Sequence, residues 1–274
     1  MKHMNHTKEQ LEREIEARAP WYQCIEFPDY GISTTDNPKN AFDDFAWDNK
    51  IGDISIEEAT RLRPKPKYEQ IVDKLPDMKG MDVLEIGCNC GFFSFKFAKA
   101  GARSVTGLDV APRWLANAEW CRDVLALGKV QFYNCDFMLF EGREPEDNGG
   151  LLGNRNQGIP LPNNLYDIVF TSTVLDHLFF PLFAIYKMIR ISRKWVIIDV
   201  PQIEDNYRED SLMKLSYPDD LSHHGFNASK TFFSGFIKRL GISENSIKTF
   251  EYNNFKNITY IVNVENFRDQ LVGA

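Results

Sequence analysis

Residues 81–91 read MDVLEIGCNCG, and this stretch decides the fold. Its apolar run, residues 83–86, fits a strand that is buried on both faces, with the acid Glu85 near its end. Gly87 then permits a tight turn, and segment 92–100 fits a helix that is buried along one side. A strand, a glycine turn and a helix in this order are typical of a nucleotide-binding crossover. The sequence therefore predicts an α/β fold.

The glycine spacing separates two kinds of nucleotide site. A dinucleotide fold has the pattern G-x-G-x-x-G, which brings a pyrophosphate onto the helix N-terminus. Here the pattern is E-x-G-x-x-x-G, with Asn89 and Cys90 between the glycines. An acid at the strand end suits a ligand that carries a cationic or amine-bearing group. A structural turn without a ligand is the alternative, because short motifs also occur by chance.

Acids also follow the next two predicted strands. Segment 104–109 ends in Asp109, 24 residues beyond Glu85, which is about where a carboxylate holds a ribose diol. Segment 130–133 leads into Asp136, for which capping of a turn is the alternative role. Acids after three successive strands are harder to explain by chance than any one of them.

These motifs resemble those of class I S-adenosylmethionine-dependent methyltransferases. The resemblance implies a Rossmann-like, mostly parallel sheet of seven strands, which the antiparallel pair 247–252 and 257–264 completes. It implies S-adenosylmethionine as the cofactor, with Asp136 facing the adenine amino group and its neighbour packing on the ring. The cofactor-binding residues that we expect are Trp21, Tyr22, Glu85, Gly87, Cys88, Asn89, Gly91, Asp109, Val110, Asp136, Phe137 and Thr171.

A narrower resemblance is to the group of tRNA wobble-uridine carboxymethyltransferases and the small-molecule methyltransferases that share their core. It covers about residues 20–200 and rests on W-Y-Q at 21–23, R-x-R-P-K-P-K-Y at 61–68 and a V-L-x-H-L-like turn at 174–178. The related enzymes commonly have Tyr-His where this chain has Asp176-His177. His177 is a candidate to orient the substrate or take a proton, and a hydrogen-bonded structural histidine is the alternative.

The aromatic residues near the N-terminus predict a second region outside the sheet domain. We expect residues 1–67 to be an extension that closes over the cofactor and substrate as a lid, although aromatic residues most often serve as core. The methyltransferase domain is expected over 68–274, with irregular insertions at 141–164 and 202–227. Within the extension, two prolines predict an extended path for the basic segment 61–67.

Composition restricts the classes of partner. A net charge of −7 and a pI near 5.4 argue against a nucleic-acid surface that is supplied by bulk charge. Five cysteines without a scaffold-like spacing predict reduced thiols in a cytoplasmic protein. The Cys88-x-Cys90 pair lacks the further ligands of a zinc site, so no metal is expected. Neither an apolar signal sequence nor a membrane-spanning stretch is visible.

The leading hypothesis is a small-molecule methyltransferase with an amino-acid-like substrate, because basic side chains can pair with a carboxylate. Methionine methylated on sulfur is one guess within that class. The alternatives are a tRNA wobble-uridine methyl- or carboxymethyltransferase and a cofactor-binding protein without catalysis. The catalytic candidates are Asp176, His177 and His224, and the substrate-binding candidates are Arg63, Lys67, Tyr207, Arg208 and His223.

Overall fold

The computed structural model describes residues 6–42, 55, 58, 61–139, 165–178, 180–201, 213–216, 225–253 and 257–267. These residues belong to two compact units. The first unit draws on 1–80, 88–135 and 253–255, and the second on 81–87, 136–252 and 256–274. The expected insertion at 141–164 lies outside the described residues.

The first unit contains the N-terminal extension together with two strands of the sheet and their helices. Its elements are α1 (Lys8–Ala17), β1 (Glu26–Phe27), η1 (Pro28–Tyr30), β2 (Ile32–Ser33), η2 (Pro38–Asn40), α3 (Lys65–Ile71), η3 (Val72–Lys74), α4 (Phe92–Lys99), β4 (Ser104–Asp109), α5 (Pro112–Val124) and β5 (Val130–Asn134).

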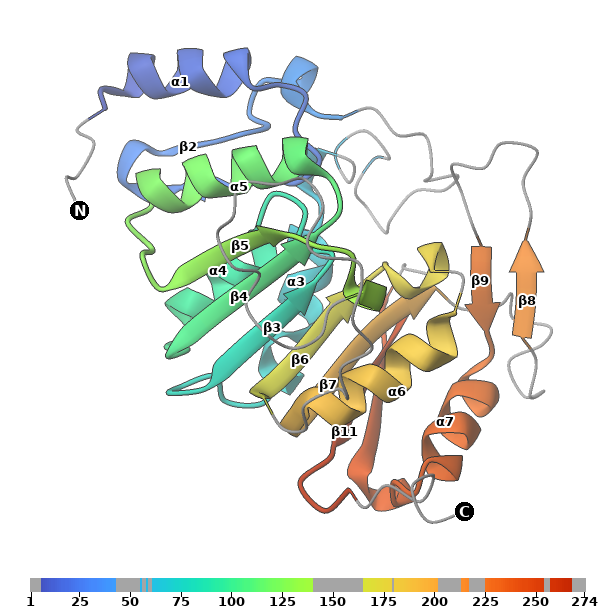
Figure 1. The fold of residues 1–274 in the computed structure, drawn as a ribbon. Helices are drawn as coiled ribbons and strands as arrows, with labels where there is room; N and C mark the ends of the chain where they lie inside the picture. The colour runs from blue at the N-terminus through green and yellow to red at the C-terminus, as the bar shows by residue number, and fades with distance from the viewer. Residues whose placement is uncertain are drawn as a thin grey trace. The chain divides into compact units, whose positions relative to one another are not determined.

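Helices α1 and α5 both belong to the first unit, and α1 lies above α5 in Figure 1. It begins as expected, because Thr7 and Gln10 form a capping box, in which each side chain bonds the other residue's backbone amide. The Trp120 indole of α5 donates to the Glu14 carboxylate at 2.7 Å, which ties the two helices together. Strands β4 and β5 pair in parallel as far as Asp109, so Asp109 stands at the carboxyl end of the pair.

The predicted extended path for 61–67 is wrong. Helix α3 begins at Lys65, with Pro66 in its first turn and Pro64 as the N-cap residue. A proline in the first helical turn costs little, because the N–H group that it lacks has no partner within the helix anyway. The basic segment therefore starts a helix within the first unit.

The second unit contains the other five strands of the sheet. Its elements are β3 (Asp82–Ile86), η4 (Phe137–Leu139), β6 (Tyr166–Ser172), η5 (Leu175–His177), α6 (Pro181–Ile191), β7 (Ser192–Pro201), β8 (Met213–Ser216), β9 (Gly225–Ala228), α7 (Lys230–Arg239), η7 (Glu244–Ser246), β10 (Ile247–Glu251) and β11 (Asn257–Asn263).

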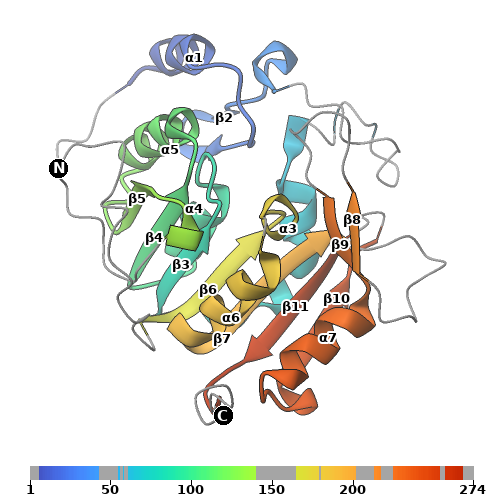
Figure 2. The ribbon, with the colours of Figure 1, turned by 45° about the vertical axis from the view of Figure 1, so that its right-hand side comes forward.

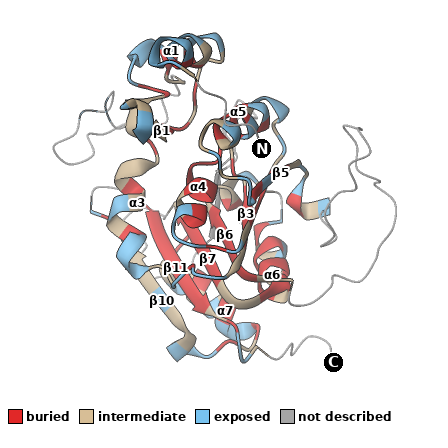
Figure 3. Cartoon of the chain, turned by 90° about the vertical axis from the view of Figure 1, so that its left-hand side faces the viewer, coloured by how far each residue is buried: buried red, intermediate tan, exposed pale blue. Residues whose placement is uncertain are grey.

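The main sheet has the strand order β10-β11-β7-β6-β3-β4-β5. In the second unit, β3 pairs in parallel with β6 and β6 with β7, whereas β11 is antiparallel to both β7 and β10. The predicted Rossmann-like sheet of seven mostly parallel strands is thus confirmed. The residues of β6, β7 and β11 are largely buried, as their red colour in Figure 3 shows. In the described part of the chain, no helix has the length and apolar character to cross a bilayer.

Two short paired strands lie in the predicted irregular insertion 202–227, in the part that the structure describes. Strands β8 and β9 pair antiparallel, from Met213 opposite Ala228 to Ser216 opposite Gly225 (Figure 2). The signal is a four-residue alternation of apolar and polar residues, which is too short to stand out within a polar loop. Strand β9 lies against η5, the turn that carries Asp176 and His177.

Candidate functional site

The glycine turn of the first unit, residues 88–91, is fixed by backbone hydrogen bonds. Cys88 N donates to Leu108 O of β4 at 3.0 Å, and Gly91 N donates to Cys88 O at 2.8 Å. Asn89 has a φ of 51°, a left-handed conformation that asparagine tolerates better than most residues. Its side-chain Oδ1 accepts from Cys90 N at 2.8 Å, so the turn is closed from within.

Gly91 is required by both conformation and space. Its φ is 89°, and a Cβ there would lie 2.7 Å from Phe132 Cζ and 2.9 Å from Phe95 Cζ. A larger residue would therefore strain the backbone and displace two buried rings.

Asp109 has the geometry of a diol acceptor. Its Oδ2 accepts from Asn89 N at 2.8 Å and its Oδ1 from Ala111 N at 2.9 Å. A carboxylate has about four lone-pair positions, so both oxygens keep capacity for a further donor. Burial raises the pKa of Asp109, and the bonds from these backbone amides oppose that rise only in part. The next residue, Val110, is 67% exposed and offers an apolar surface beside the carboxylate. This set fits a ribose with an attached ring.

The predicted cofactor ligands Trp21 and Tyr22 pack inside the first unit. Trp21 is buried, its indole donates to Ile15 O at 2.9 Å, and its ring lies 5.9 Å from that of Trp120. The Tyr22 ring lies 6.0 Å from that of Trp114 on α5. Both side chains thus hold the extension on α5, and direct contact with a cofactor stays a prediction.

In the second unit, the residues at the ends of β3 and β6 are tightly packed. Glu85 and Thr171 are buried, and the Thr171 hydroxyl donates to Ile86 O at 3.2 Å. A Cβ on Gly87 would lie 2.2 Å from Val174 Cγ2, and its φ is 71°. Glycine is therefore needed where β3 ends.

Asp136 and Phe137 open the short helix η4. The Asp136 Oδ1 accepts from Met138 N at 2.8 Å, which is the turn-capping contact that was the alternative for this residue. Phe137 is buried, and the Lys187 ammonium lies 4.8 Å from the centre of its ring. The predicted adenine contacts of the two residues stay predictions.

The catalytic candidates Asp176 and His177 share the turn η5. The Asp176 Oδ2 lies 3.6 Å from the His177 Nε2, an ion-pair distance that exceeds hydrogen-bond range. The His177 side chain is exposed, and Asp176 is largely covered. An exposed imidazole beside a carboxylate can exchange a proton with a bound molecule.

Asp199 is a buried strand acid that the sequence analysis did not identify. It is 1% exposed near the end of β7, and its Oδ2 accepts from the Ser172 hydroxyl at 2.6 Å. Its backbone carbonyl accepts from Thr173 N at 2.8 Å, and its Oδ1 from Asn257 Nδ2 at 3.2 Å. Asp199 therefore anchors the segment that leads into η5. The pattern of an apolar run ending in an acid, already used for Glu85, was its signal.

The substrate candidates Arg63 and Lys67 are both buried in the first unit. The Arg63 guanidinium donates to Tyr22 O at 3.0 Å and Phe42 O at 2.7 Å. These bonds give Arg63 a structural role, and a role in substrate binding stays a prediction for both residues. The remaining candidates lie outside the described residues: Tyr207, Arg208, His223 and His224.

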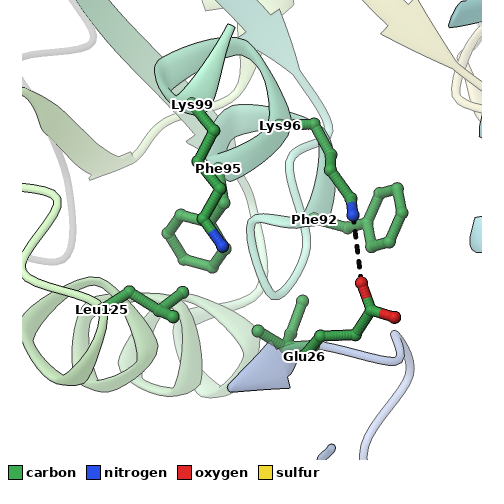
Figure 4. A pocket seen from close by; sticks show the side chains of 7 residues that line it. Glu26, Phe92, Phe95, Lys96, Lys99 and Leu125 are labelled. Atoms are coloured by element: carbon green, nitrogen blue, oxygen red, sulfur yellow. Dashed lines mark hydrogen bonds and ion pairs between the residues drawn. The ribbon is translucent and has the colours of Figure 1, made fainter. Parts of the chain in front are cut away.

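A small surface hollow, partly open to solvent, lies beside α4 in the first unit (Figure 4). It is lined by Ile25, Glu26, Phe92, Phe95, Lys96, Lys99 and Leu125. Burial acts to raise the pKa of Glu26, but hydrogen bonds from Lys65 and Lys96 outweigh it, so the pKa is lowered. None of the predicted cofactor acids Glu85, Asp109 and Asp136 lines the hollow, so the cofactor is not assigned to it. Among the described residues, no group of three or more His, Cys, Asp or Glu is arranged to hold a metal.

Comparison with known proteins identifies a protein family that this chain matches. A family model described as "Methyltransferase domain" matches residues 77–215, just over half of the chain. The tRNA U34 carboxymethyltransferase of Marinobacter nauticus is 29% identical over 45% of this chain and 32% of its own length. That of Pseudoalteromonas translucida is 26% identical over 44% and 32%. The match thus spans about a third of these curated relatives.

Two solved structures share the fold. The N-terminal domain of EvdMO1, crystallised in the presence of SAH and D-fucose, has a TM-score of 0.59 at 15% identity, over 96% of this chain and 99% of that chain. An S-adenosylmethionine dependent methyltransferase from Mesorhizobium loti has a TM-score of 0.51 at 13% identity, over 72% and 97%. At these identities the likeness concerns the fold alone.

Proposed function

The chain belongs to the methyltransferase-domain family, and from that premise we propose that it transfers the methyl group of its cofactor, S-adenosylmethionine, to a small, amino-acid-like molecule. The thioether sulfur of methionine is the first acceptor to test within this class. The observation that carries the choice of a small acceptor is the state of the basic segment 61–67.

A tRNA-binding surface needs accessible cations, because each phosphate contact depends on a neutralising charge. In segment 61–67, Arg63 and Lys67 are buried, and the Lys65 ammonium pairs with the Glu26 carboxylate at 2.5 Å. The net charge of the whole chain is −7. The cations of this segment are thus buried or paired within their own unit, and the protein is acidic overall. Both observations support a small substrate over a polyanion.

For the cofactor, we propose that Asp109 accepts from the ribose hydroxyls and that Val110 contacts the adenine. The spare lone pairs of the carboxylate and the exposed valine beside it support this assignment. The cofactor supplies an electrophilic methyl group on a sulfonium, and the protein orients the reactants and excludes water. Glu85 and Asp136 are proposed as the further acidic contacts of the cofactor.

The nature of the accepting atom decides whether a base is needed. A thioether carries no proton, so His177 would then only position the substrate. An amine or hydroxyl acceptor must lose a proton, and the exposed imidazole of His177 beside Asp176 supports a role as the base. Replacement of His177 by Gln should therefore lower kcat for a protonated acceptor and leave it nearly unchanged for a thioether.

A second candidate is modification of the wobble uridine in tRNA, since the curated relatives are named tRNA U34 carboxymethyltransferases. It would require a basic surface, which segment 61–67 does not offer. A carboxylated cofactor in place of S-adenosylmethionine belongs to the same candidate.

The test is a pair of acceptor assays with methyl-labelled S-adenosylmethionine. One contains a pool of amino acids and related metabolites, and the other contains total tRNA; carboxy-S-adenosylmethionine is offered to tRNA as a third reaction. We expect label in a small molecule alone. Label or a carboxymethyl group in tRNA would refute the proposal in favour of the second candidate.

A further inference from the structure

Helix α4 begins without a capping side chain of its own. Gly91 occupies its N-cap position, and no side chain of this residue can accept from the first turn. Serine, threonine, asparagine and aspartate usually supply that acceptor, because the first N–H groups of a helix have no partner within it. Crowding by Phe132 and Phe95 excludes all of them at this position.

Gln23 supplies the missing acceptor from the N-terminal extension. Its Oε1 accepts from Phe92 N, the first residue of α4, at 3.0 Å, and the side chain is only 7% exposed. The backbone amides of Tyr22 and Gln23 also face the thiol of Cys90, where they act to lower its pKa. Burial nevertheless raises the pKa of Cys90 to about 12, so this buried group stays neutral. Residues 22–23 thus hold the glycine turn at two neighbouring points.

The backbone around Gln23 is held by Arg63. The Arg63 guanidinium bonds to Tyr22 O, and its Cζ lies 4.0 Å from the centre of the Tyr22 ring. The main chains of the two segments are also hydrogen-bonded to each other, since Cys24 N donates to Arg63 O at 2.8 Å. These contacts fix the backbone on both sides of Gln23, so the cap does not have to order this stretch of main chain as well.

The glycine turn connects the contact with Gln23 to the contact with Asp109. The turn runs from Asn89, whose amide donates to the Asp109 Oδ2 at 2.8 Å, to Phe92, whose amide Gln23 accepts. Rotation of these few residues would move both amides together. The cap on one end of the turn therefore limits the positions that the Asp109 carboxylate can adopt at the other.

We propose that Gln23 is a positioning residue for the cofactor: it caps α4 in place of an N-cap side chain, and so holds the Asn89 amide on Asp109 and the carboxylate in place for the ribose diol. The inference rests on the ribose assignment of the proposed function. It makes the extension part of the cofactor site through the turn that it holds.

Two variants at one position separate the acceptor from the bulk of the side chain. Gln23→Met keeps the length and removes the strong acceptor, whereas Gln23→Glu keeps an acceptor that the helix N-terminus favours. The readouts are the dissociation constant for S-adenosylmethionine by calorimetry and hydrogen exchange of the amides in 89–93. For Gln23→Met we expect roughly three- to tenfold weaker binding and about tenfold faster exchange. Gln23→Glu should stay within about twofold of wild type in both.

Equal impairment of both variants, or wild-type values for Gln23→Met, would overturn the inference. Faster exchange in Gln23→Met with unchanged affinity would overturn it as well, because the cap would then position nothing. Asp109→Asn is measured in parallel. Wild-type affinity in that variant would refute the ribose assignment itself, which separates failure of the proposed function from failure of the role of Gln23.

Discussion

Replacement of Asp109 by Asn should weaken binding of S-adenosylmethionine strongly. Each carboxylate oxygen already accepts one backbone amide, at 2.8 and 2.9 Å, and so offers its remaining lone pairs to the ribose. The Asn side chain has one acceptor oxygen in place of two. Its NH₂ group would therefore face a backbone N–H that has lost its hydrogen-bond acceptor. Loss of one charged hydrogen bond and weakening of a second cost about 2–4 kcal/mol, or roughly 30- to 900-fold in Kd.

Titration calorimetry of the purified protein measures this effect. Asp123→Asn is the matched control, because Asp123 lies on α5 in the same unit and pairs with Arg122 at the surface; its Kd should equal that of wild type. A Kd for Asp109→Asn within about threefold of wild type would refute the reasoning, since even one lost charged hydrogen bond exceeds that change.

The same residue predicts a pH dependence. The pKa of Asp109 is raised above 3.8 in the folded protein, chiefly by burial. Its contribution to the stability of the cofactor-free protein is thus greatest below the unfolded value of 3.8, and is lost as the pH rises through the folded value. Cofactor binding needs the ionised form, so affinity should fall as the pH is lowered through the folded pKa. In Asp109→Asn this part of the pH dependence should disappear.

Three further changes test the account of the fold. Gly91→Ala should destabilise the protein by about 1–3 kcal/mol more than Gly80→Ala in urea unfolding, because both have a positive φ but only Gly91 is crowded. The pKa of Asp167 is lowered, chiefly by its hydrogen bond from Arg193. Asp167→Asn should therefore reduce the free energy of unfolding by about 1–2 kcal/mol above pH 3.8. This difference from wild type should vanish as the pH falls through the lowered pKa of Asp167. Arg63→Lys should lower the thermal stability by about 2 kcal/mol, whereas an unchanged Tm with a raised substrate KM would support the predicted role in substrate binding.

Local patterns made the strands and the glycine turn predictable. The run 83–86, its acid and the two glycines encode a strand, a turn and a helix within a few residues, and each local choice agrees with the fold. Asp109 could be found for the same reason, because an apolar run ends in it. Asp199 follows the same rule, because it ends the apolar run 195–198 of β7.

Contacts between distant segments could not be read from the sequence. Gln23 and Phe92 are 69 residues apart, and nothing in either neighbourhood marks a helix cap supplied from so far away. Arg63 looks like a solvent-facing cation in a basic run, yet it is buried against backbone carbonyls. Pro66 suggested an extended chain, but the same residue is also compatible with a first helical turn. Tertiary packing determines which of these local conformations and environments each residue adopts.

Mass spectrometry of one reaction tests the central claim most directly. The reaction contains the protein, S-adenosylmethionine, a pool of amino acids and related metabolites, and total tRNA, and both product pools are analysed after nuclease digestion. The account predicts that one small molecule gains the mass of a methyl group in step with formation of S-adenosylhomocysteine, while the nucleosides stay unchanged. A modified uridine in the digest, with no methylated metabolite, would contradict it.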